Sequence, residues 1–288
     1  MSAEQRVRRP LSADSPARRP LSAGSRVLAP FSRRAARVLE RRVYGAYVVL
    51  RCADPDGPRP RAGQFYMLAA RRWGGGDGER PFLPRAFSVL RSGADHERAF
   101  LIEDVGPGTH RLCELQAGED LLLVGPLGLG FGAPEDARRP LLVGGGVGIA
   151  PLAIWQDELG GASALVGFRD APRAEGARLL ADARVATDDG SVGHRGLVTD
   201  LLREELDGDA HATVYACGPP AMLESVRVLC AARETPAQLA LESGMACGYG
   251  ACFGCVVPTH DGYLRLCVDG PVLDAARLQS ALAPGATH

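Results

Sequence analysis

The stretch Leu141-Leu-Val-Gly-Gly-Gly-Val-Gly-Ile-Ala-Pro151 decides the fold of the second half of this chain. The apolar run Pro140–Val143 predicts a buried strand, the glycines predict a tight turn, and Ile149–Leu159 predicts a helix. The pattern is related to the dinucleotide fingerprint G-x-G-x-x-G but does not match it. Its backbone N–H groups suit a pyrophosphate, although a tight turn that binds no ligand would have the same sequence.

Strands and helices alternate downstream of this turn. Apolar runs predict strands at Ala164–Phe168, Val185–Thr187 and Thr213–Cys217, and helices at Leu197–Leu206 and Pro220–Arg233. This alternation predicts βαβ units and a parallel sheet, over residues 136–237. Cys217 ends a strand at the carboxyl edge, where ligands bind in open α/β sheets. A buried strand residue is the alternative interpretation of Cys217.

Upstream, residues 37–135 have an all-β pattern. Short apolar runs between Gly- and Pro-rich turns predict a small antiparallel barrel or sandwich; these runs are Val43–Leu50, Gln64–Ala70, Ala86–Leu90, Ala99–Asp104 and Asp120–Val124. Two motifs here suit phosphate: Arg85-Ala-Phe-Ser88 supplies a guanidinium, and Gly106-Pro-Gly-Thr109 leads into a short helix. Each is weak alone, because the first is commonly a strand start and the second a turn.

The N-terminus and the overall charge exclude several classes of function. Residues 1–36 carry the hexapeptide Arg-Arg-Pro-Leu-Ser-Ala twice, and we predict a disordered Arg/Pro/Ser-rich tail, with an arm that binds an acidic partner or RNA as the alternative. The 288 residues carry a net charge of −1, which gives no footprint for nucleic acid. No apolar run is long enough for a membrane span or a secretory signal. We therefore expect a cytoplasmic protein that binds neither nucleic acid nor membranes.

Four of the eight cysteines are clustered. Cys247-Gly-Tyr-Gly-Ala-Cys252-Phe-Gly-Cys255 is followed by Cys267, with the spacing C-x4-C-x2-C-x11-C. Three thiolates on a tight loop and a fourth from a separate strand suit a [2Fe-2S] cluster, and the glycines at 248, 250 and 254 permit unusual dihedrals and close approach. Structural zinc is the alternative, although its ligands usually form two paired knuckles. Residues 238–288 are predicted to form a small cluster lobe.

The order of these signals resembles the ferredoxin-NADP reductase superfamily, with Arg85–Ser88 as the flavin motif and Gly144–Pro151 and Cys217–Pro219 as nicotinamide motifs. A closer resemblance is to the electron transfer subunits of NAD-dependent dihydroorotate dehydrogenases. It is carried by Thr187–Asp200, Glu242–Val257 and Cys267–Val272. It implies an α+β multidomain chain with an antiparallel β-barrel flavin domain, an α/β parallel-sheet nucleotide domain and a small C-terminal [2Fe-2S] lobe.

The resemblance also implies site residues. Arg85 would pair with FAD phosphate, Phe87 and Ser88 would contact the isoalloxazine and ribityl region, and Gly108 and Thr109 would bind the pyrophosphate. Ala86, Leu101, Ile102 and Glu103 complete the FAD set, although many members have Tyr-Arg where this chain has Ile102-Glu103. Gly145, Gly146 and Gly148 would frame NAD, with Cys217 as the catalytic residue beside the nicotinamide. The metal ligands would be Cys247, Cys252, Cys255 and Cys267.

The implied activity is electron transfer in de novo pyrimidine biosynthesis. Electrons from dihydroorotate would reach FMN in a separate catalytic subunit and then pass through the [2Fe-2S] cluster and FAD to NAD+. A heterotetramer of two plus two subunits is expected. A flavin is the carrier that joins one-electron and hydride chemistry. The alternatives are a subunit of a ferredoxin-NADP transhydrogenase or sulfhydrogenase, a zinc-stabilised binding protein, and a monooxygenase reductase working alone. The stretch Gly167-Phe-Arg-Asp170 does not decide between NAD and NADP, because Arg169 suits a 2′-phosphate and Asp170 suits a ribose hydroxyl.

Overall fold

The computed structural model describes residues 33–71, 83–134 and 136–282. The predicted tail falls outside the described residues as far as residue 32, and the first strand begins at Arg34. The Arg34 guanidinium is held by the Asp54 carboxylate, with Nε 2.8 Å from Oδ1. The last residues of the predicted tail are therefore part of the folded chain.

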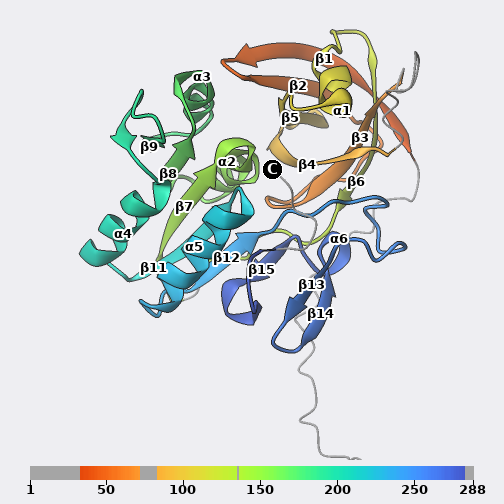
Figure 1. The fold of residues 1–288 in the computed structure, drawn as a ribbon. Helices are drawn as coiled ribbons and strands as arrows, with labels where there is room; N and C mark the ends of the chain where they lie inside the picture. Colours follow the sequence, from red (N-terminus) through yellow and green to blue (C-terminus); the bar gives the residue numbers. More distant parts are fainter. Residues whose placement is uncertain (1–32, 72–82, 135, 283–288) are drawn as a thin grey trace, which may run out of the picture.

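Six antiparallel strands close into a barrel in the order β1-β2-β5-β4-β3-β6, which agrees with the predicted barrel (Figure 1). The strands are β1 (Arg34–Tyr44), β2 (Tyr47–Ala53), β3 (Phe65–Ala70), β4 (Arg85–Ser92), β5 (Glu97–Glu103) and β6 (Asp120–Leu127). A short helix, α1 (Pro107–Cys113), joins β5 to β6. The apolar side chains predicted from the sequence fill the barrel interior, because alternate residues of each strand face inward.

The single strand predicted at Val43–Leu50 is in fact a hairpin. The chain turns at Gly45, which has a φ of +55°, and Val43 pairs with Val48 across the turn. A Cβ at Gly45 would overlap the carbonyl oxygen of Pro172, so the hairpin tip packs on the nucleotide domain. One glycine in a run of Val and Tyr is a weak turn signal, which explains the missed hairpin.

The second sheet has seven strands in the order β10-β9-β8-β7-β11-β12-β15, as the alternation of strands and helices predicts for most of it. Its parallel strands are β7 (Arg139–Gly145), β8 (Ser163–Phe168), β9 (Ala183–Thr187), β10 (His194–Arg195), β11 (Ala212–Cys217) and β12 (Ala237–Ala240). The helices of this region are α2 (Ile149–Glu158), α3 (Ala171–Ala174), α4 (Val198–Gly208) and α5 (Pro220–Ala231).

The cysteine-rich segment is an excursion from this sheet. The predicted lobe boundary at residue 238 falls inside β12, and the chain returns as β15 (Val272–Asp274), antiparallel to β12. Between them lie the cysteine loop and β13 (Val256–Thr259), β14 (Gly262–Arg265) and α6 (Leu266–Asp269). Figure 1 shows this blue segment below the barrel. Buried Leu239 and Leu273 join both of its ends to the core of the nucleotide domain.

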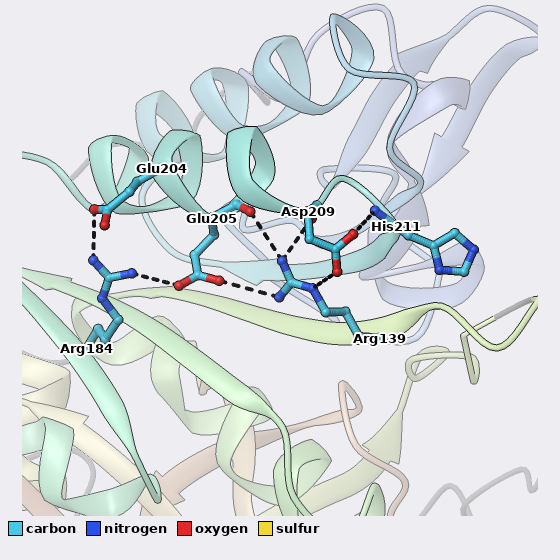
Figure 2. A network of polar contacts seen from close by, with 6 residues as sticks. All are labelled: Arg139, Arg184, Glu204, Glu205, Asp209 and His211. Carbon is cyan, nitrogen blue, oxygen red and sulfur yellow. Dashed lines mark hydrogen bonds and ion pairs between the residues drawn. The ribbon is translucent and has the colours of Figure 1, made fainter.

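Arginines tie α4 to the sheet near the start of β7 (Figure 2). Arg184 on β9 pairs with Glu204 and Glu205 at 2.8 and 2.7 Å. Arg139 on β7 pairs with Asp209 at 3.0 Å and also donates to the Asp209 carbonyl at 2.9 Å. The network lies at the amino ends of the strands, so it leaves the carboxyl edge of the sheet available for ligands.

Within the part of the chain that the structure describes, no helix is long and apolar enough to cross a membrane.

Candidate functional site

The two weak phosphate motifs of the barrel lie together. Arg85 begins β4, and Gly108 is in the first turn of α1. A Cβ at Gly108 would come within 2.9 Å of the Arg85 Nε, so the guanidinium lies directly against this glycine. An arginine beside the backbone of a helix start is a suitable arrangement for a phosphate.

The resemblance implies that Thr109 binds the pyrophosphate, but in the structure its hydroxyl is bonded within the turn itself. Its Oγ1 accepts hydrogen bonds from the N–H groups of Val105 and Gly106, at 2.9 and 3.0 Å. It also donates to the Gly106 carbonyl at 2.9 Å. The hydroxyl therefore holds the turn in place, and a contact to a pyrophosphate would have to come from its backbone.

The remaining FAD candidates divide by burial. Ala86 is exposed, and Phe87 and Ser88 are half-buried along the same strand. Leu101 and Ile102 are in the barrel core, so their side chains are not available to a ligand. Glu103 is half-buried, and its carboxylate pairs with Arg173 of the nucleotide domain at 2.8 Å. The side chain that replaces the usual arginine thus bridges the two domains.

The glycine turn lies at the carboxyl end of β7, as predicted, and continues through a 3-10 turn (Gly146–Gly148) into α2. Gly145 and Gly148 are needed for close packing: a Cβ at Gly145 would be 2.7 Å from the Met222 Sδ, and one at Gly148 would overlap the Cys217 carbonyl. Gly146 has a φ of +54° and open space around its missing Cβ. Of the three predicted glycines, Gly146 has the most room for a ligand.

Cys217 ends β11 beside this turn, where it pairs with Gly144. Its side chain is buried, and burial raises the pKa of the thiol well above its ordinary value. Such a thiol is neutral, so it can pack against a ligand or donate weakly but is no nucleophile.

Glu242, which the sequence analysis did not select as a site residue, contributes electrostatically to the high pKa of Cys217. Burial raises the pKa of the Glu242 carboxyl itself to about 7. A lone Glu before a cysteine loop carries no pattern that marks it in the sequence.

The four clustered cysteines form two sulfur pairs. The Sγ atoms of Cys255 and Cys267 are 3.2 Å apart without a disulfide. Cys252 also interacts with Cys247: partial burial opposes ionisation of Cys247, but hydrogen bonds from the backbone and side chain of Cys252 and from the Tyr249 backbone lower its pKa to about 6. Burial and the neighbouring Cys255 raise the pKa of Cys267 to about 12. A bound cation would reverse that effect, because it favours the thiolate.

This arrangement fits a two-iron cluster held by four thiolates. Among the described residues, no three His, Cys, Asp or Glu side chains lie close enough together to hold a metal ion, so the four thiols stand as pairs and not as a closed ligand set. The loop brings N–H groups to the sulfurs, from Gly254 to Cys252 and from Cys267 to Cys255, each at 3.5 Å. Gly248 and Gly250 have the positive φ values expected of them, +80° and +86°. Gly254 does not have a positive φ; the third positive φ of the loop is at Phe253.

Met67 joins the cysteine loop to the strand that carries the predicted FAD motif. A Cβ at Gly248 would be 2.6 Å from the Cγ of Met67 on β3, and Met67 pairs with Ala86 on β4. The loop therefore packs on the barrel beside the Arg85–Ser88 motif. This proximity is what electron transfer between a cluster and a flavin requires.

Comparison with known proteins agrees with this geometry. Residues 242–279 match the family model of the iron-sulfur cluster binding domain of dihydroorotate dehydrogenase B, and residues 172–228 match an oxidoreductase NAD-binding domain. The first match confirms the predicted iron–sulfur site over the zinc alternative. The cofactor set predicted from the sequence, FAD, a [2Fe-2S] cluster and NAD, agrees with these findings.

Curated relatives cover most of the chain. The electron transfer subunit of dihydroorotate dehydrogenase B (NAD(+)) from Clostridium acetobutylicum is 34% identical over 223 residues, which are 76% of this chain and 86% of the relative. The one from Caldanaerobacter subterraneus is 36% identical over 245 residues, 82% of this chain and 94% of the relative.

The fold is also found in a solved structure. A chain of the NADH-dependent reduced ferredoxin-NADP oxidoreductase superposes with a TM-score of 0.72 at 24% identity, over 87% of this chain and 92% of that one. This likeness confirms the predicted architecture.

Proposed function

This chain belongs to the family of dihydroorotate dehydrogenase B electron transfer subunits, and from that premise we propose that it carries electrons from a dihydroorotate-oxidising partner to NAD+ in pyrimidine biosynthesis. The observation that carries the proposal is the two-pair cysteine loop packed, through Met67, on the flavin strand. It supports the proposal because the predicted cluster loop and the strand with the predicted FAD motif lie next to each other in one chain.

Different residues of the chain bind each of the three redox groups. FAD exchanges electrons singly or in pairs, the cluster exchanges one at a time, and NAD+ takes two as hydride. Arg85 and the backbone at Gly108 hold the FAD phosphates, and Cys247, Cys252, Cys255 and Cys267 hold the cluster. The turn at 146–148 holds NAD, and Cys217 packs at the nicotinamide end of that site.

The partner binds where the cluster is nearest the surface. Cys252 is exposed. The described residues include three exposed aromatic side chains, and all three are near Cys252 in the sequence: Tyr249, Phe253 and Tyr263. Arg265 lies over the Phe253 ring at 5.2 Å. Aromatic and arginine side chains are enriched in protein interfaces.

We propose that the partner is an FMN-containing catalytic subunit and that the complex has two copies of each subunit. We also propose a cytoplasmic location, because the thiolate ligands require a reducing compartment.

The experiment is to co-purify the chain with candidate catalytic subunits and to follow NADH formation driven by dihydroorotate. In the Cys255→Ser variant we expect bound flavin and NADH-driven dye reduction to persist while transfer from the partner falls to background. Cys230→Ser is the matched control, because Cys230 is buried in α5. Transfer that survives in Cys255→Ser would show that the cluster is not on the path.

The same purified protein distinguishes the transhydrogenase alternative from the proposed function. A protein fully loaded with flavin and iron that shows no dihydroorotate-driven NADH formation with any such subunit, but reduces ferredoxin, would favour it. A colourless protein after anaerobic reconstitution would favour the zinc-stabilised binding protein instead.

A further inference from the structure

Tyr47, at the start of β2, has a buried hydroxyl with no hydrogen-bond partner among the described residues. Its side chain is 0% exposed. The ring is fixed from two sides: a Cβ at Gly176 would be 2.9 Å from the Tyr47 Cε2, and the Phe168 ring centroid is 6.4 Å away. A fixed, buried and unpartnered hydroxyl is costly, so it needs an explanation.

The hydroxyl faces the glycine turn across the domain boundary. The Tyr47 oxygen is 4.0 Å from the position that a Cβ of Gly146 would take, and it is the nearest atom outside the adjoining residues of the turn. Strand β5, which pairs with β2 and places Glu103 opposite Tyr47, also contacts the turn at 146–148. The barrel therefore forms the wall opposite the turn.

The charges around Tyr47 are balanced so that an anion can be accepted there. Glu103, Arg173, Asp170 and Arg169 all act electrostatically on the hydroxyl. Arg173 pairs with both acids, with 2.8 Å to Glu103 and 2.6 Å to Asp170, and together with Arg169 it balances their two negative charges. Arg169 is exposed. The two acids therefore do not leave a net negative charge that would repel a phosphate.

The hydroxyl is also restricted to one chemical role. Burial, the largest influence, and then Glu103 raise the pKa of Tyr47 far above its ordinary value. The group therefore stays protonated and offers a donor to an acceptor atom at any physiological pH.

We propose that the barrel completes the dinucleotide site, with the Tyr47 hydroxyl donating a hydrogen bond to a pyrophosphate oxygen of NAD(H) bound at Gly146–Gly148. The inference rests on the NAD site of the proposed function and adds a residue from the flavin domain to it. Tyr47 is a positioning residue: it fixes the dinucleotide between the two domains and takes no part in hydride transfer.

The test is Tyr47→Phe in the holoprotein, with ADP-ribose as the probe because it carries the pyrophosphate but cannot be reduced. We expect the Kd for ADP-ribose and for NADH to rise about tenfold, while FAD and iron content are unchanged. The ligand-free variant should melt about 2–4 °C higher, since it no longer buries an unpartnered hydroxyl. The variant thus gains stability and loses affinity, a combination that damaged packing does not produce.

Tyr66→Phe is the matched control. Tyr66 is also fully buried, but it is on β3, where its ring lies 5.4 Å from that of Phe100. This variant should bind ADP-ribose normally. Unchanged ADP-ribose binding in Tyr47→Phe, or loss of FAD from it, would overturn the proposal. Binding is measured without the partner subunit, so a failure of dihydroorotate-driven transfer would leave this result standing.

Discussion

The turn at residues 145–148 and the loop at residues 247–255 are both rich in glycine, but their glycines meet different neighbours. In the turn, a Cβ at Gly145 or Gly148 would collide with Met222 or with the Cys217 carbonyl. In the loop, Gly248 and Gly250 have φ values of +80° and +86°. The turn thus uses Gly145 and Gly148 for space alone, whereas Gly248 and Gly250 of the loop need a positive φ as well as space beside Met67 and Val268. Glycine count alone does not show which of the two a ligand site needs.

Gly148→Ala tests the need for space and should have the largest effect. The new Cβ would overlap backbone atoms of Cys217, which cannot move without shifting the end of β11. We expect a loss of about 3 kcal/mol or more in the free energy of unfolding, together with loss of NADH binding. Chemical denaturation and titration with ADP-ribose measure the two effects.

Gly254→Ala is the matched variant in the cysteine loop. The nearest atom to its Cβ would be the Cys252 Sγ at 3.6 Å, an ordinary contact, and Gly254 does not have a positive φ. We expect wild-type iron content and a change in unfolding free energy within about 0.5 kcal/mol. If both variants were equally damaging, the distinction between the turn and the loop would be wrong.

Glu242 lies between the two regions, after β12 and before the cysteine loop. Burial raises the pKa of its carboxyl from 4.5 to about 7. The unfolded chain ionises first, so this group should make the protein progressively less stable as pH rises from 4.5 to about 7, and no less stable above that. Glu242→Gln should therefore gain up to about 3 kcal/mol over the wild type at high pH.

The measurement is the unfolding free energy of both proteins across this pH range. Near pH 4.5 the neutral carboxyl and the amide should give similar stabilities. If the two unfolding free energies differed by the same amount at every pH, the carboxyl would not titrate as its burial predicts. The difference would then come from packing and not from charge.

Much of the fold could be predicted, because the decisive signals are local. Periodicity found both sheets, and the glycine turn fell at the end of β7 as expected. The hairpin at Gly45 was missed because one glycine in a run of Val and Tyr is a weak turn signal, and its contact with Pro172 comes from far away in the sequence. The lobe boundary at 238 was placed inside β12 because four residues are too few to show a period.

The candidate site was predictable where a motif carries its own chemistry. The spacing of Cys247, Cys252 and Cys255 pointed to a cluster, and its family match bears this out. Residues that act across the domain boundary gave no signal. Tyr47 reads as one more β-strand tyrosine, and Glu103 as a departure from a flavin motif, until the fold brings Arg173 and the glycine turn against them.

Arg184→Ala should have a small effect, and it tests the region outside the two glycine-rich segments. Arg184 is 42% exposed and pairs with Glu204 and Glu205, and exposed pairs contribute little. We expect a loss of about 0.5–1 kcal/mol in unfolding free energy that disappears in high salt, with ADP-ribose binding and iron content unchanged. Arg139→Ala should cost more, because Arg139 also donates to the carbonyls of Glu205 and Asp209. Weaker ADP-ribose binding in Arg184→Ala would mean that the amino ends of the strands are coupled to the carboxyl edge, and that the two glycine-rich regions do not account for the site alone.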